Sequence, residues 1–275
     1  MKTPSNITMP FFAYGIFKPG QLCYPRINKL VEDFEKGTVG GFLKERDGIP
    51  LLVKSSCSYE ITGFLINFNK GKEEDAYNRI IEIEPDEVYK WGEVKVDDRV
   101  SANALLGKRE QRGSSDMEGV LEWDGKNDPL FKHGLEEVEE VLRSNQKFDW
   151  DCKSLFRLQM AYMLLWSAIE RFAGLKYHLG KKATDKVYQI ANEDCFADSL
   201  KKHVKEDRTV YGSVDLEKYS LDPNDPKKSM QYYYQVRSNS VHRGKAGIRD
   251  FDIVKNSLEE LLAIFKDILS NAWKY

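Results

Sequence analysis

The sequence predicts an α+β protein of two domains, a mixed α+β domain followed by an all-α helical bundle. Three observations support this prediction. Short β-branched and aromatic runs, separated by Gly, Pro, Asp and Asn, fill residues 9–106, a pattern typical of strands and turns. Beyond Trp123 the apolar residues recur every three or four positions, which is the helical period. Residues 108–118 ("KREQRGSSDME") are polar and aperiodic, so we expect domains at 1–120 and 121–275.

The first domain is expected to contain several short strands and one helix. Its strand-like apolar runs are 11–17, 37–43, 50–53, 59–68, 91–96 and 101–107. The stretch "EEDAYNRIIEI" at residues 73–83 predicts the helix, because its apolar residues have helical spacing.

The second domain is expected to contain long helices. Apolar residues line one face of 134–145 and 251–273, and they surround 154–175 almost completely. Residues 207–226 are rich in Asp, Pro and Gly, which predicts a long loop, and a long loop inside a helical domain is often functional or mobile.

Composition and cysteine spacing exclude several classes of protein. With 41% hydrophobic residues, 31% charged residues and a net charge of −2, the chain is globular and is not coated in base. Any nucleic-acid contact must therefore be a local patch. The cysteines lack CxxC spacing, so neither a zinc site nor a disulfide framework is indicated. No apolar run is long enough for a membrane span, and we expect a cytoplasmic protein without a metal or cofactor.

The tetrapeptide Tyr14, Gly15, Ile16, Phe17 follows an apolar strand and precedes "KPGQ". A tight turn there would present backbone N–H groups at the end of the strand, where they could hold a carboxylate or carbonyl oxygen. These four residues are candidate substrate-binding residues. The alternative is a plain strand-to-turn transition in which Gly15 serves only the backbone geometry.

Four motifs in order resemble the γ-glutamylcyclotransferase-like fold over residues 1–105. They are "FFAYGIFKPGQ", "GTVGGFLKERDGIPLLV", "YEITGFLINF" and "IIEIEPDEVYKWGEVKV". The resemblance implies a small mixed β-barrel-like fold. It also implies a glutamate that handles protons while the substrate's α-amine attacks its own γ-carbonyl, releasing 5-oxoproline and an amine.

Glu84 matches the catalytic glutamate of that family, and Glu82 is the alternative if the segment is a strand. A half-buried carboxylate with a raised pKa can exchange a proton near neutrality. The chain departs from the family pattern at Pro85, where glycine is usual, and at Phe17, where leucine is usual. Many proteins with this fold are not cyclotransferases, so a ligand-sensing domain is the competing interpretation.

"VRSNSVHRGK" places Arg237 and His242 close together without a set of metal ligands. This pair suits metal-independent RNA cleavage. Histidine can take a proton from the 2′-hydroxyl or give one to the 5′-oxygen, while arginine stabilises charge on the phosphorane. The alternative is a polar helix end that carries Arg and His near solvent.

With "LLWSAIERF" and "DPLF", this motif resembles the HEPN superfamily, especially its ApeA-like branch, over 127–275. The resemblance implies a homodimeric endoribonuclease of a defence or toxin system, with Glu170 at an acidic position seen in many members. Serine follows the arginine, where the most active branches prefer Asn, Asp or His. Further candidate RNA-binding residues are Ser238, Asn239, Arg243 and Lys245, with Arg249 adding positive charge.

The tyrosines of "YYYQVR" are candidate stacking residues, although they could equally pack in the core. Arg171 and His178 match the same loose spacing, but they sit at the end of an apolar helix, and we interpret Arg171 as a surface or cap residue.

Three functional hypotheses follow from the sequence. The first is a metal-independent endoribonuclease whose N-terminal domain senses or modifies a trigger. The second is a cyclotransferase acting through Glu84, with the helical domain used for dimerisation, and the third is a non-catalytic nucleotide- or RNA-binding protein. The expected partners are RNA, a second copy of the chain, a small-molecule or peptide trigger at the N-terminal domain, and an inhibitor or antitoxin protein.

Overall fold

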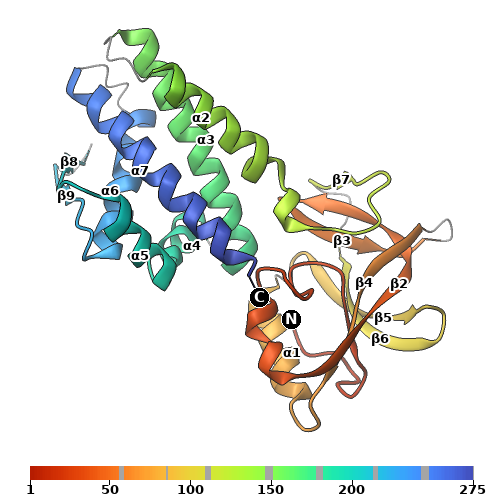
Figure 1. Cartoon of the computed structure of the whole chain (residues 1–275). Coiled ribbons are helices and arrows are strands. Elements are labelled where there is room, and N and C mark those ends of the chain that lie inside the picture. Colours follow the sequence, from red (N-terminus) through yellow and green to blue (C-terminus); the bar gives the residue numbers. More distant parts are fainter. Residues whose placement is uncertain are drawn as a thin grey trace. The chain divides into compact units, whose positions relative to one another are not determined.

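In the computed structural model the described residues are 1–55, 59–84, 86–108, 113–145, 151–177, 182–212, 216–242 and 248–274. The chain forms two compact units (Figure 1). Unit 1 comprises Met1–Asp128, Gly174–Lys182 and Ala272–Tyr275, and unit 2 comprises Pro129–Ala173 and Ala183–Asn271. The chain therefore passes from unit 1 to unit 2 at Asp128 and returns to unit 1 at Gly174.

Unit 1 is built around a five-stranded barrel. Strands β1, β4, β2, β3 and β6 pair in this order, and β6 pairs with β1 to close the ring. Strand β5 extends the sheet beside β6, and β7 pairs with β2. The strands are β1 (Phe11–Ala13), β2 (Val31–Arg46), β3 (Ile49–Val53), β4 (Tyr59–Phe68), β5 (Tyr89–Val96), β6 (Val100–Gly107) and β7 (Ser115–Asp116). A mixed α and β fold is thus confirmed.

Local sequence explains how this barrel turns and closes. Asp47 and Gly48 join β2 to β3 with φ values of 51° and 81°, the backbone that favours Asp-Gly in a two-residue hairpin. Gly63 of β4 lies so close to β1 that a Cβ atom there would be 2.6 Å from the Ala13 carbonyl oxygen. A larger residue at that position would push β1 and β4 apart, so Gly63 permits the close approach of these strands.

Helix α1 (Glu73–Ile83) packs on the barrel through its apolar face. Ala76, Tyr77, Ile80 and Ile83 are buried, as the helical spacing of these apolar residues predicts. The Tyr77 hydroxyl donates to the Met9 carbonyl at 2.8 Å and accepts from the Asn103 side chain at 2.9 Å. These contacts hold the middle of α1 against the segment before β1 and against β6.

Unit 2 is mainly helical, and helix α3 runs on into unit 1. Its regular elements are a π-helical turn (Leu130–Gly134), α2 (Leu135–Ser144), α3 (Cys152–Tyr177), α4 (Ala183–Ile190), α5 (Asp194–His203), α6 (Pro226–His242) and α7 (Ile248–Ala272), with strands β8 (Thr209–Tyr211) and β9 (Lys218–Ser220). Aromatic rings fill the core. Phe131, Phe172 and Phe265 contact one another edge to face, and the Tyr162 hydroxyl donates to the Tyr233 carbonyl at 2.9 Å.

The expectation of an all-α bundle is not confirmed, because β8 and β9 form an antiparallel two-stranded sheet within the predicted loop 207–226. Val210 is buried while its neighbours Thr209 and Tyr211 are exposed. This alternation lets a three-residue strand bury one apolar side chain beside α6 (Figure 1). Such a short strand is difficult to recognise in the sequence, because Gly, Asp and Pro residues surround it.

A buried ion pair joins the segment before β8 to α7. Arg208 donates to both carboxylate oxygens of Glu260, with 2.9 Å between Nη1 and Oε1, and both side chains are largely buried. The Tyr233 hydroxyl also donates to Glu260, at 3.1 Å. The pair therefore links three parts of unit 2 that are distant in sequence.

We expect Glu260→Gln to lower the free energy of unfolding of unit 2 by about 3 kcal/mol, because the Arg208 cation stays buried without its counter-charge. The midpoint of the urea transition, followed by far-ultraviolet circular dichroism, measures this loss. The control is Glu140→Gln, which breaks the exposed Arg143–Glu140 pair and should cost less than about 1 kcal/mol. Equal losses in the two variants would contradict this interpretation of the Arg208 pair.

Candidate functional site

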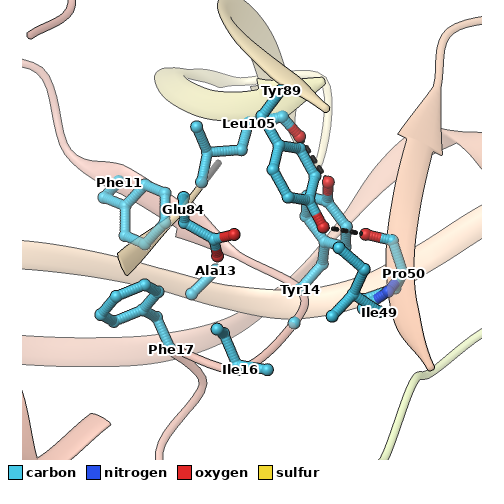
Figure 2. A pocket seen from close by; sticks show the side chains of 11 residues that line it. Phe11, Ala13, Tyr14, Ile16, Phe17, Ile49, Pro50, Glu84, Tyr89 and Leu105 are labelled. Carbon is cyan, nitrogen blue, oxygen red and sulfur yellow. Dashed lines mark hydrogen bonds between the residues drawn. The ribbon is translucent and has the colours of Figure 1, made fainter. Parts of the chain in front are cut away.

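The strongest candidate site is a pocket in unit 1, which we call the Glu84 pocket. It lies where β1 ends, β3 begins and α1 terminates. Its lining residues are Phe11, Ala13, Tyr14, Gly15, Ile16, Phe17, Ile49, Pro50, Glu84, Tyr89 and Leu105. Figure 2 shows the Glu84 carboxyl group among the rings of Phe11, Phe17 and the two tyrosines. The barrel thus gathers residues from distant parts of the sequence around one carboxyl group.

Glu84 occupies its position because α1 ends one residue earlier. It is the C-cap residue, its backbone N–H donates to the Ile80 carbonyl at 3.0 Å, and its extended ψ of 124° turns the chain away from the helix axis. Glu82 stays on the exposed face of the helix. Of the two glutamates considered from the sequence, only Glu84 reaches the pocket.

Burial raises the pKa of the Glu84 carboxyl to about 8. Its side chain makes no hydrogen bond or ion pair with any residue in the described ranges, so nothing there compensates the charge. The C-terminal end of α1 also carries a partial negative charge, which further disfavours ionisation. Glu84 is therefore a carboxyl group that can both accept and donate a proton near neutral pH.

The predicted loop lies against the same pocket. The Gly15 carbonyl accepts from Lys18 N–H at 3.0 Å, and the Ile16 carbonyl accepts from Cys23 N–H at 2.9 Å, which defines a tight turn. The N–H groups of Gly15, Ile16 and Phe17 are used by none of the hydrogen bonds among the described residues. Unused N–H groups in a turn at the end of a strand can bind a ligand oxygen.

Two buried tyrosines frame the pocket. The Tyr14 hydroxyl donates to the Leu105 carbonyl at 2.5 Å and accepts from Leu52 N–H at 3.1 Å, and the Tyr89 hydroxyl donates to the Pro50 carbonyl at 2.6 Å (Figure 2). Burial raises the pKa of both hydroxyls, and the Glu84 charge raises both further. Their hydroxyl protons are committed to backbone oxygens, so they shape the pocket and leave acid–base chemistry to Glu84.

The pocket is small and partly open to solvent. Its volume is about 310 Å³ with the mouth included, and the centre of a water molecule can reach about 20 Å³ of it. This is room for about one water molecule or one ligand oxygen. The reacting part of a ligand must therefore be small, while its remainder extends into the mouth.

Tyr89, Pro50 and Phe11 line the pocket although no motif in the sequence marks them as site residues. Tyr89 follows Glu84 by five positions, and an apolar residue at the start of a strand gives no sign of which cavity it faces. Pro50 likewise has no sequence pattern that indicates its place. In the structure its ring lies so close to Gly15 that a Cβ atom on Gly15 would be 3.1 Å from it. Closure of the barrel brings these residues together.

In unit 2, Arg237 of the predicted motif links α6 to α3. Arg237 forms an ion pair with Glu170 at 3.3 Å, and its guanidinium lies 5.5 Å from the centre of the Tyr234 ring. The Arg237 Nε atom is buried and has no hydrogen-bond partner in the described part of the chain. Two residues predicted separately for the RNA site, Arg237 and Glu170, are therefore brought together.

Other residues predicted for the RNA site lie in different surroundings. Asn239 is buried, donates to the Tyr211 carbonyl at 3.1 Å and accepts from Gln235 at 3.0 Å, while Ser238 is half-buried. His242 ends α6, but its side chain lies outside the described residues, as do Arg243 and Lys245.

The tyrosine run divides between core and surface. Tyr232 and Tyr233 are fully buried, which matches the alternative of core packing, so these two rings cannot stack on RNA bases. Tyr234 is half-buried and contacts Trp166 and Tyr188.

Within the described ranges, no group of three or more His, Cys, Asp or Glu residues could hold a metal ion. The helices in those ranges include none with the length and hydropathy needed to cross a membrane. No family model matches the chain, and neither a curated protein nor a solved structure matches it.

Proposed function

We propose that unit 1 is a γ-glutamylcyclotransferase-like domain that converts a γ-glutamyl amide into 5-oxoproline and an amine. One observation carries the proposal. The carboxyl group of Glu84, with a pKa near 8, is buried in a pocket that the turn at residues 15–17 also lines. The order of the sequence motifs supports the same family.

In the proposed reaction, ionised Glu84 takes a proton from the α-ammonium group of the substrate. A bound ammonium lowers the pKa of Glu84, so the carboxylate forms more readily when substrate is present. The freed α-amine attacks the γ-carbonyl carbon, and the new C–N bond places negative charge on the carbonyl oxygen. Backbone N–H groups of Gly15, Ile16 and Phe17 are suited to stabilise that charge.

Collapse of the intermediate breaks the original γ-amide C–N bond. Glu84 relays two protons in all from the attacking nitrogen to the leaving nitrogen, so the amine departs as an ammonium ion. Glu84 returns to its ionised form, and the α-nitrogen remains in the lactam ring of 5-oxoproline. No oxidant, reductant or metal enters this balance.

Unit 2 supports a second proposed function, metal-independent RNA cleavage by a HEPN-type domain. The observation that favours it is the Arg237–Glu170 pair, which fixes a half-buried guanidinium while its Nε donor stays unused by described residues. Arg237 would stabilise charge on the cleaved phosphate, and His242 would act as acid and base. The proposal includes a homodimer, a defence or toxin role, a trigger bound by unit 1 and a restraining antitoxin protein.

We further propose a cytoplasmic location. Among the described residues the thiols of Cys23 and Cys152 form no disulfide, and reduced thiols are usual in a reducing compartment.

Induced expression in bacteria tests the nuclease proposal. We expect the wild-type chain to slow growth and degrade RNA, and its purified form to cleave RNA in the presence of a chelator. His242→Ala and Arg237→Ala should each reduce cleavage at least about 100-fold, because each removes one group from the chemistry. His133→Ala is the matched control, since that histidine is exposed on a different element. Cleavage that survives His242→Ala would contradict the assignment.

A further inference from the structure

A second cavity lies in unit 2, and neither proposed reaction uses it. We call it the β8 groove. It is bounded by β8, by one face of α6 and by the first turns of α7, and its volume is about 390 Å³. By the same measure the Glu84 pocket offers about 20 Å³, so the β8 groove is the roomier of the two. Its size falls in the range of roughly 300–1,000 Å³ found for small-molecule sites.

The floor of the groove is apolar. Val210 of β8, Val236 of α6 and Val254 of α7 line it, and all three are buried. Such a floor favours the face of a planar or apolar group, since contact there removes little polar surface from water. The lining residues come from four elements of unit 2, because Gln159 of α3 joins those of β8, α6 and α7.

The edge of the groove carries one unpaired cation. Arg249 is exposed and makes no ion pair with any residue in the described part of the chain. Asp250, which also lines the groove, already has an interaction of its own. An arginine that faces a cavity and has no carboxylate partner is suited to bind a phosphate through its guanidinium fork.

An aromatic ring lies at the same edge. Tyr211 lines the groove with 53% of its surface exposed, although the rest of β8 is held against α6 by the hydrogen bond from Asn239 to the Tyr211 carbonyl. Fixing the backbone while leaving the ring exposed creates a stacking surface. Stacking on an aromatic side chain contributes about 1–3 kcal/mol per nucleobase.

We infer that the β8 groove binds a nucleoside monophosphate, with the base between Tyr211 and the valine floor and the phosphate at Arg249. Among its described lining residues the groove has one unpaired guanidinium, which suits one phosphate group. Additional phosphates would find no further unpaired cation among the described lining residues. The monophosphate could come from a free nucleotide or from the end of an RNA chain.

The β8 groove is distinct from the Arg237–Glu170 pair, although both use α6. Val236, Asn239 and Ser240 face the groove, whereas Arg237 contacts Glu170 of α3 and the ring of Tyr234. The inference therefore rests neither on RNA cleavage nor on the chemistry of Glu84.

Calorimetric titration of the full chain with AMP and with adenosine tests the inference. We expect AMP to bind and adenosine to bind at least about 10-fold more weakly, because it lacks the charged partner of Arg249. Arg249→Gln should weaken AMP binding by a similar factor. Tyr211→Ala should weaken it about 5- to 100-fold, while Tyr211→Phe, which keeps the ring, should retain it. Lys201→Gln, an exposed charge change on α5, is the control and should bind AMP normally.

Absence of AMP binding at millimolar concentration, or equal binding by Arg249→Gln and the wild-type chain, would overturn the inference. Equal affinity for adenosine and AMP would do the same. Displacement of AMP by a 5′-phosphorylated trinucleotide would identify an RNA end as the source, and no displacement would identify a free nucleotide. Arg249→Gln should leave 5-oxoproline release unchanged, and Glu84→Gln should leave AMP binding unchanged, so failures of the two proposals are separable.

Discussion

Glu84→Gln is expected to lower 5-oxoproline release from a γ-glutamyl amide by about 1,000-fold, the loss typical when a general acid–base group is removed. The substitution keeps the size of the side chain and removes only its ability to exchange a proton. Because Glu84 lies in the pocket without a described hydrogen-bond partner, glutamine leaves no charged residue unpaired. Release of 5-oxoproline and of free amine, measured together, gives the rate.

Glu82→Gln is the matched control for this experiment. Glu82 is exposed on α1, two residues from Glu84, and the same chemical change there should leave the rate within about 2-fold of wild type, as is usual for surface substitutions. An equal loss in both variants would point to a general disturbance of α1. Full activity in Glu84→Gln would remove Glu84 from the mechanism.

The pH dependence of the wild-type rate provides an independent test. The pKa of Glu84 in the empty pocket is about 8, so the ionised fraction of the free enzyme falls as the pH drops below this value. Since ionised Glu84 starts the reaction, kcat/KM should fall about 10-fold per pH unit on the acid side of pH 8. A profile that levels off near pH 5 would indicate a carboxyl with an ordinary pKa and would contradict the role of burial.

The comparison of Glu82 with Glu84 shows what the sequence can predict about this site. As part of a strand, the two residues would share one face, because side chains alternate with a period of two. The helical spacing of Ala76, Tyr77, Ile80 and Ile83 predicts a helix instead, and α1 ends at Ile83. The position of the helix end therefore decides which carboxyl is buried. The spacing of apolar residues predicts that a helix is present. It does not predict where the side chain of the first residue beyond the helix points, because that depends on tertiary packing.

The remaining lining residues depend on closure of the barrel. Tyr89 of β5 and Pro50 of β3 meet because both strands pair with β6. Strand β3 pairs with it in parallel, with Leu52 opposite Leu106, and Tyr89 lies opposite Gly107. No local pattern specifies that pairing, since parallel strands are joined by long connections and their register is set by the whole sheet. The loop at residues 14–17 could be predicted because its Gly and flanking strand are local signals.

In unit 2 the long helices could be predicted from periodicity, whereas the faces of α6 could not. Its polar and aromatic residues lie on all sides, so the sequence gives no single buried stripe. Contacts with α3, β8 and α7 decide that Tyr232 and Tyr233 are core residues and that Asn239 is internal. The same contacts leave Arg249 and Tyr211 at the edge of the β8 groove, a cavity that periodicity alone cannot indicate.

The second large effect expected at Glu84 concerns stability. In the unfolded chain its carboxyl ionises near the ordinary value of 4.5, and in the folded chain burial holds its proton up to about pH 8. Below pH 4.5 both states are protonated, and the contribution of Glu84 to stability is fully present. As the pH rises from 4.5 to 8 only the unfolded state loses the proton, so this contribution is lost, and above pH 8 the loss is complete.

Glu84→Gln removes this titration. The free energy of unfolding of the Glu84→Gln variant minus that of the wild type should therefore increase by about 4–5 kcal/mol between pH 4.5 and pH 9, at about 1.4 kcal/mol per pKa unit. Native-state hydrogen exchange of β4 amides, with both chains compared at the same pH, measures the difference because intrinsic exchange rates cancel. Glu82→Gln should show no such trend. A constant difference between Glu84→Gln and wild type would mean that Glu84 titrates normally when folded. The proposed proton relay would then lack its physical basis, because a normal carboxyl would be a weak base near neutrality.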